Sequence, residues 1–290
     1  MATLLKILNW LLPLLYMAVL VESGTAFFAH GNAPAAESEP VGEGEGGRKR
    51  NLWLLPVIAV HLAFLVLRAV HLGYPPVANS WEILSVLAVC TVAVYAGIEF
   101  ASRDSRIEVF ILLPVFLFQY TSSVFLSGSV GLADSAQRLA APPGWARLHV
   151  VPAILAYSAF TIAAVYGALH LRARSNLKHR KFGLLFDRLP SLEVLGGMVW
   201  YALVAGFAFM TIAVVTGGVM SYALAGQGGV DISALQVAVM AVIGTAVWVA
   251  YLAAILGHSL WKWPESRVSL IAVNGFLALI LLLAVSIFMP

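Results

Sequence analysis

The chain has 290 residues, of which 61% are hydrophobic and only 11% are charged, and its mean hydropathy is +0.92. This composition excludes an ordinary soluble domain and is typical of membrane proteins that cross the bilayer several times. The formal net charge is only +3, and no basic run with interleaved aromatic residues indicates a nucleic-acid partner. The partner expected first is therefore the lipid of a membrane.

Eight apolar blocks follow one another along the chain, each long enough to cross a bilayer as a helix of about 20 residues. They are residues 4–29, 52–72, 83–101, 108–127, 149–171, 194–225, 232–257 and 268–288. Strand-like alternation is absent, and the blocks are too long for the strands of a barrel. The sequence therefore predicts an all-α, polytopic integral membrane helix bundle of about eight transmembrane helices.

Lysine and arginine residues gather in alternate connections, as they do in the cytoplasmic loops of membrane proteins. The connections after the first, third, fifth and seventh blocks carry most of the 17 basic residues: Arg48, Lys49, Arg50, Arg103, Arg106, Arg172, Arg174, Lys178, Arg180, Lys181, Arg188, Lys262 and Arg267. This asymmetry predicts that both termini face outward.

The connection between the first two blocks differs in composition from the rest of the chain. Residues 30–50 are rich in Gly, Pro and Glu and lack apolar periodicity, which predicts a disordered cytoplasmic linker. We therefore divide the chain into a first transmembrane helix at 1–29, this linker at 30–50 and a seven-helix membrane domain at 51–290. The first helix is expected to be retained, because its apolar run is long for a signal peptide.

The segment from His61 to Leu87 places ionisable side chains in apolar sequence, where polar groups are costly and are therefore candidates for function. His61 lies near the middle of its block, where its imidazole needs a partner. Two alternatives are open, a hydrogen bond between helices or axial ligation of haem iron. Arg68 is expected to snorkel outward. Glu82 either caps the next helix or pairs with Arg68 or with a group of a ligand.

The depth of the other histidines suggests one further pairing. His71 and His149 both lie at the outer ends of their blocks and could face one ligand. His170 and His258 lie at the opposite ends of theirs, where the helix dipole alone favours histidine. The chain contains no P-loop, no GxGxxG opening a helix, no HExxH and no GxSxG, so none of the chemistries tied to those motifs is indicated.

From His61 onward the sequence resembles the cytochrome c assembly family, multispan haem-handling membrane proteins of the CcsA and HemX-like kind. Seven residues occupy the positions of a family pattern without a gap: His61, Arg68, Gly73, Pro76, Asn79, Glu82 and Leu84. Two later segments are also similar to the family, HVVPAILAYSAF from His149 and WPESRVSLIAVNGF from Trp263. The resemblance spans about residues 50–285.

This resemblance implies a multi-pass protein of the bacterial plasma membrane that acts in cytochrome c biogenesis or haem handling, with haem b as its cofactor. His149 and His61 become candidate ligands of the haem iron. His258 matches a family histidine only with a shift of two residues. His71 has no counterpart in the family pattern, but it could replace an external ligand.

The resemblance also assigns an outer pocket and partners. Trp81, Glu82 and Arg68 would line that pocket, with the guanidinium of Arg68 able to meet a haem propionate. Other membrane subunits or cytochrome c maturation proteins are the protein partners that it implies, and haem would be bound or relayed through the histidines.

Two departures from the family pattern argue against independent catalysis. The loop that carries a Trp-rich motif in the synthases of this family reads AGQGGVDISALQ here and keeps only Asp231. A GLHSY-like segment with a second external histidine is replaced by SIFMP. Two alternatives therefore stay open. One is a non-catalytic membrane subunit or regulator of a larger complex that keeps the fold without haem, and the other is a b-haem/quinol electron-transfer subunit.

Overall fold

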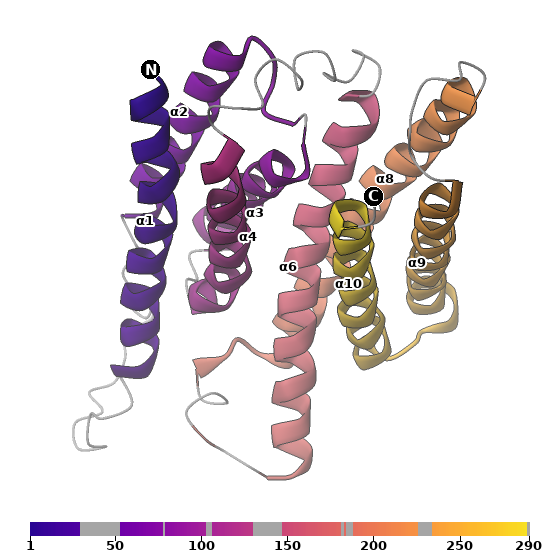
Figure 1. Cartoon of the computed structure of the whole chain (residues 1–290). Helices are drawn as coiled ribbons and strands as arrows, with labels where there is room; N and C mark the ends of the chain where they lie inside the picture. The colour runs from indigo at the N-terminus through magenta and orange to yellow at the C-terminus, as the bar shows by residue number, and fades with distance from the viewer. Residues whose placement is uncertain are drawn as a thin grey trace.

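The computed structural model describes residues 1–29, 53–77, 79–102, 106–129, 147–180, 183, 188–225 and 234–288. Within these ranges the helices are α1 (Ala2–Ala29), α2 (Leu54–Leu72), α3 (Ser80–Ser102), α4 (Glu108–Ser129), α6 (Arg147–Lys178), α8 (Leu192–Ala225), α9 (Ala234–Trp261) and α10 (Glu265–Phe288) (Figure 1). All eight are long and apolar enough to cross a membrane, which confirms the predicted helical bundle. The predicted linker at 30–50 lies outside the described residues.

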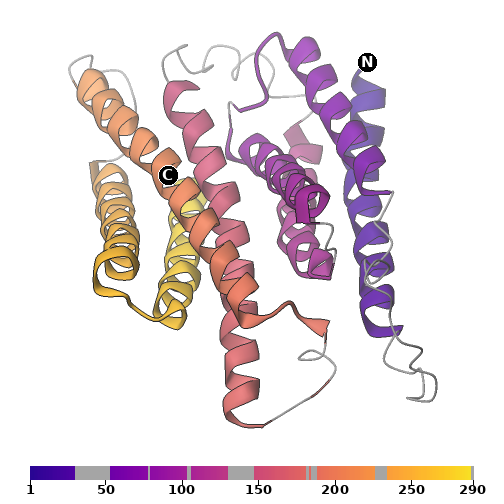
Figure 2. The same cartoon turned by 180° about the vertical axis from the view of Figure 1, so that it is seen from behind.

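The helices form two groups that meet at α6, as the two opposite views show (Figures 1 and 2). In the first group α1, α2, α3 and α4 pack on one another, and in the second α8, α9 and α10 pack together with α6. Because α6 also contacts α3 and α4, it belongs to the interface of both groups. Side chains near the start of α6 can therefore meet residues from either group.

The longest departure from the predicted spans occurs in α6. The apolar block ends at residue 171, but the helix runs from Arg147 to Lys178, and its 32 residues measure about 48 Å at 1.5 Å per residue. The helix continues into RARSNLK because Arg, Ala, Leu and Lys are strong helix formers and keep their propensity outside the apolar zone. Figure 1 shows the lower end of α6 extending below the other helices.

A chain of hydrogen bonds links all four helices of the first group. His61 Nδ1 lies 2.9 Å from the hydroxyl of Tyr16, and His61 Nε2 lies 2.9 Å from Oγ of Ser85. Ser85 donates to Oε1 of Gln119 at 2.9 Å, and Gln119 Nε2 donates to Oγ of Ser123 at 3.0 Å. Since the proton of Ser85 goes to Gln119, His61 donates from Nε2 and accepts from Tyr16 at Nδ1.

All of these side chains are fully buried, so the hydrogen bonds are made away from lipid. Of the two alternatives that the sequence left open for His61, the structure places this residue in hydrogen bonds between helices, and both ring nitrogens are engaged. Iron ligation by His61 stays a prediction, and it would require one of these two bonds to break.

Replacing Gln119 with leucine is expected to lower the free energy of unfolding by about 1–3 kcal/mol, because the buried Ser85 hydroxyl then loses its acceptor. Asn274→Leu is the matched control, since Asn274 is exposed and donates only to the carbonyl of Leu270 on its own helix. Unfolding in detergent micelles, followed by circular dichroism, measures both variants. An equal loss in the two would contradict a contribution from the buried chain.

Candidate functional site

Arg68 and Glu82 form a buried ion pair between α2 and α3. Nη2 and Nε of Arg68 lie 2.7 Å and 2.9 Å from Oε1 of Glu82, and the two side chains are 4% and 0% exposed. The expectation that Arg68 snorkels outward is therefore wrong, because Glu82 holds its guanidinium inside the bundle. The cap of α3 comes from Asn79, whose Oδ1 accepts the backbone N–H of Glu82 at 2.8 Å.

Trp81, also predicted for the outer pocket, anchors the start of α3 to α4. Its ring stacks on Phe125 with centroids 4.0 Å apart, and its carbonyl accepts a 2.7 Å hydrogen bond from Ser122. Together with the ion pair, these contacts fix the first turn of α3 against both neighbouring helices. Ile83, two residues after Trp81, is thereby held in the wall of a cavity.

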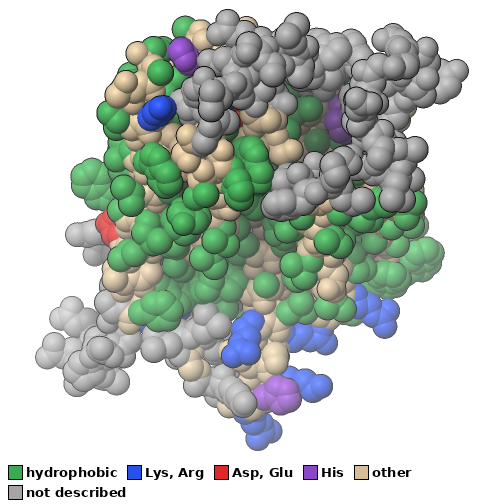
Figure 3. Space-filling view, viewed as in Figure 1, with side chains coloured by type: hydrophobic (Ala, Val, Ile, Leu, Met, Phe, Trp, Pro, Cys, Tyr) green, Lys and Arg blue, Asp and Glu red, His purple; other side chains and the backbone are tan. Residues whose placement is uncertain are grey.

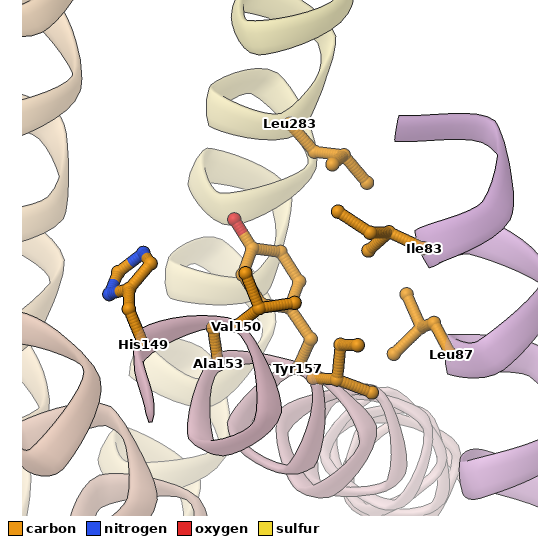
Figure 4. Close-up of a pocket in the computed structure, with 8 residues that line it drawn as sticks. Ile83, Leu87, His149, Val150, Ala153, Tyr157 and Leu283 are labelled. Atoms are coloured by element: carbon orange, nitrogen blue, oxygen red, sulfur yellow. The ribbon is translucent and has the colours of Figure 1, made fainter. Parts of the chain in front are cut away.

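This cavity of about 140 Å³ lies between α3, α6 and α10, where the two helix groups meet (Figure 4). Six apolar and two polar side chains line it: Ile83, Leu87, Val150, Ala153, Ile154, Leu283, His149 and Tyr157. The hydroxyl of Tyr157 donates to the carbonyl of Leu279 on α10 at 3.2 Å. Of the predicted site residues, His149 alone contributes to this lining.

The imidazole of His149 is held by α8. Its Nδ1 lies 2.7 Å from the carbonyl oxygen of Ala213, which can only accept, so Nδ1 carries a proton, and in the neutral ring the lone pair is on Nε2. One turn further along α8, Gly217 leaves room for the ring, because a Cβ at that position would lie 2.9 Å from Cε1 and from Nδ1 of His149. A backbone-held Nδ1–H beside an unprotonated Nε2 is the usual state of a histidine that binds a metal.

The sequence did not predict which residues of α8 hold the imidazole of His149. Ala213 lies 64 residues from His149, and no pattern in the sequence links the two. The pair Gly217-Gly218 permits close approach of another group, but the same span also contains Gly196, Gly197 and Gly206, so the pair does not single out this position.

The other predicted histidines lie away from this cavity. His61 belongs to the hydrogen-bond chain of the first group, and His71 ends α2, which is separated from α6 by α3. His258 ends α9, where its Nδ1 lies 3.3 Å from the carbonyl of Trp263 and its ring lies 4.5 Å from that of Trp200. The pairing of His71 with His149 stays a prediction. In the described ranges, no three His, Cys, Asp or Glu residues gather in a metal-binding group.

Comparison with known proteins identifies the family of the fold that carries this site. A family profile described as Cytochrome C assembly protein matches residues 77–289, which is most of the chain and includes the cavity and all of α8. The chain belongs to the cytochrome c assembly family. The resemblance noted in the sequence is thereby confirmed for these residues, whereas α1 and α2, with His61 and Arg68, precede the matched part.

This chain is similar to Protein HemX of Brevibacillus brevis, with which it is 29% identical over 167 residues. The match covers 57% of this chain and 59% of that protein, so the chain spans about three fifths of its relative's length. No solved structure matches the chain.

Proposed function

We propose that this protein acts in cytochrome c biogenesis by holding haem b at the cavity between α3, α6 and α10, with Nε2 of His149 as a ligand of the iron. Membership of the cytochrome c assembly family supports the biological role. The hydrogen bond from Nδ1 of His149 to Ala213 is the observation that carries the ligand assignment, because it places the single proton of the neutral ring on Nδ1 and so leaves Nε2 as the nitrogen able to bind iron. Neutral imidazole is a common axial ligand of haem iron.

The shape and chemistry of the cavity suit an edge of the macrocycle. Pockets that enclose a whole ligand of comparable size usually measure about 300–1,000 Å³, whereas this cavity measures about 140 Å³. Its walls are almost entirely apolar, as a porphyrin edge requires, and Ile83, Leu87 and Leu283 would exclude water from it. Bound haem would supply a redox-active iron, and the residues of this chain would hold and orient the group.

On this proposal the protein binds or relays haem and has no catalytic step of its own. Other membrane subunits or cytochrome c maturation proteins would receive the haem or deliver it. The plasma membrane of a bacterium is the location proposed, and the bacterial source of the HemX relative supports it.

Hemin titration of detergent-purified protein tests the ligand. The unsubstituted protein is expected to give the Soret band of ligated haem, and His149→Ala is expected to bind hemin about tenfold or more weakly, because the iron loses a ligand. The matched control is His179→Ala, which removes an exposed histidine beyond the opposite end of α6 and should leave the titration unchanged.

Three results would decide against this proposal. A protein that gives no ligated spectrum with excess hemin would favour the alternative of a haem-free membrane subunit or regulator. An unchanged titration for His149→Ala would move the ligand to another residue. Reduction of the bound haem by an added quinol would favour an electron-transfer subunit.

A further inference from the structure

Four exposed basic residues follow one another at the end of α6 opposite His149: Arg172, Arg174, Lys178 and Arg180. The first two lie closer to the apolar part of the helix than the last two. His170 joins α6 to α10 near this end. Its Nδ1 lies 2.9 Å from Oγ of Ser269, and its Nε2 lies 3.6 Å from Oε2 of Glu265. Since Glu265 is the first residue of α10, His170 marks the level at which α10 begins. Everything that follows His170 on α6 extends beyond this level.

Arg172 and Arg174 follow His170 by about 3 and 6 Å along the helix axis, whereas Lys178 follows it by about 12 Å and Arg180 lies further still. The headgroup layer of one leaflet is about 5–8 Å thick. When the start of this layer is placed at the level of His170, Arg172 and Arg174 fall within it, and Lys178 and Arg180 fall outside it.

Lys262 in the connection from α9 to α10 and Arg267 in the first turn of α10 are two more exposed cations near the start of α10, and the guanidinium of Arg267 lies over the ring of Trp263. Beside them Trp261 is 64% exposed, and tryptophan is enriched at the interface between membrane and water. In Figure 3 most of the visible lysine and arginine side chains lie along the lower edge, below the apolar surface, and one lies near the top.

Two carboxylates lie near this level: Glu265, whose side chain is 42% exposed, and Glu193, which is exposed and precedes Gly196 of α8 by three residues. Glu265 contacts His170, and it packs so closely on Gly196 of α8 that a Cβ there would overlap its carboxylate. The four exposed cations near this level outnumber these two carboxylates, so this end of the bundle has an excess of positive charge.

We propose that Arg172, Arg174, Lys262 and Arg267, the headgroup-level cations, form a binding surface for anionic phospholipid headgroups, and that Lys178 and Arg180 take no part in it. A basic residue near an anionic membrane surface strengthens binding by about fivefold. Lys178 and Arg180 contribute little, because attraction from beyond the headgroup layer is screened within about 8 Å at physiological salt. This surface is independent of haem.

Two double variants of the full chain with equal loss of charge test the assignment. Arg172→Gln/Arg174→Gln removes two headgroup-level cations, and Lys178→Gln/Arg180→Gln removes the two beyond them. Each protein is incubated in detergent with phosphatidylglycerol and phosphatidylcholine in equal amounts, and the retained lipid is quantified by native mass spectrometry. Circular dichroism checks that helix content is preserved.

The unsubstituted protein is expected to prefer phosphatidylglycerol. Arg172→Gln/Arg174→Gln should weaken that binding about thirtyfold, and Lys178→Gln/Arg180→Gln should change it less than about twofold. Lys262→Gln tests the same surface from the α9–α10 connection and should cost about fivefold. Equal losses in the two double variants, a loss confined to Lys178→Gln/Arg180→Gln, or an unsubstituted protein without preference for the anionic lipid would each overturn the proposal.

Discussion

Glu82→Ala is expected to lower the free energy of unfolding by about 3–5 kcal/mol, because it leaves a buried guanidinium without its counter-ion. Arg68 is 4% exposed, and Nε and Nη2 of its guanidinium both donate to Oε1 of Glu82. Removal of the carboxylate strands this positive charge between α2 and α3, where water does not replace the lost acceptor. Unfolding in detergent micelles, followed by circular dichroism, gives the change in stability.

The double variant Arg68→Met/Glu82→Met separates the loss of the charge pair from the loss of packing. Methionine at both positions keeps much of the side-chain volume and removes both charges, and such replacements of buried ion pairs are often neutral or stabilising. We therefore expect the double variant to recover most of the stability lost in Glu82→Ala. A double variant as unstable as Glu82→Ala would show that the stranded charge is not the cause.

Gly217→Ala is expected to weaken hemin binding about 10- to 100-fold, the range found when a group that orients a metal ligand is altered. The added Cβ would lie 2.9 Å from Cε1 and Nδ1 of His149, so the ring has to move away from the carbonyl of Ala213. Nδ1 then loses the hydrogen bond that determines its tautomer. Titration with hemin, compared with the unsubstituted protein, measures the effect.

Gly218→Ala is the matched control for this prediction. It makes the same chemical change one residue further along α8, but no heavy atom lies within 4 Å of the added Cβ. Any gain in helix propensity is therefore common to both variants, and only Gly217→Ala meets the imidazole. Two results would contradict the assigned role of the contact between the His149 ring and Gly217. One is a Gly218→Ala variant that weakens hemin binding as much, and the other is a Gly217→Ala variant with unchanged binding.

Much of the architecture could be predicted because the bilayer sets a minimum length for each apolar block. The eight predicted spans agree with the eight helices of the described residues, apart from differences at their ends. The largest difference is at α6, where hydropathy marks the edge of the apolar zone and helix propensity continues past it to Lys178. Hydropathy therefore does not locate the end of a helix that continues past its apolar block.

The site was predicted less completely, because depth along a helix does not say which way a side chain points. His149 was predicted as a ligand, and the structure adds the α8 backbone that orients it. Arg68 and Glu82 also show that the sequence does not give the direction of a side chain. Pairing was one of several alternatives for Glu82, and the wrong expectation for Arg68 came from treating its helix as if it faced lipid.

The sequence by itself determined the membrane class, the number of spans and the family, since these depend on composition, block length and local motifs. Only the tertiary structure decided that His61 meets Tyr16 and Ser85, and that His149 meets Ala213 and Gly217. The physical reason is that neighbouring helices are chosen by close packing and hydrogen bonds between segments far apart in the chain, and these depend on the shapes of both faces at once.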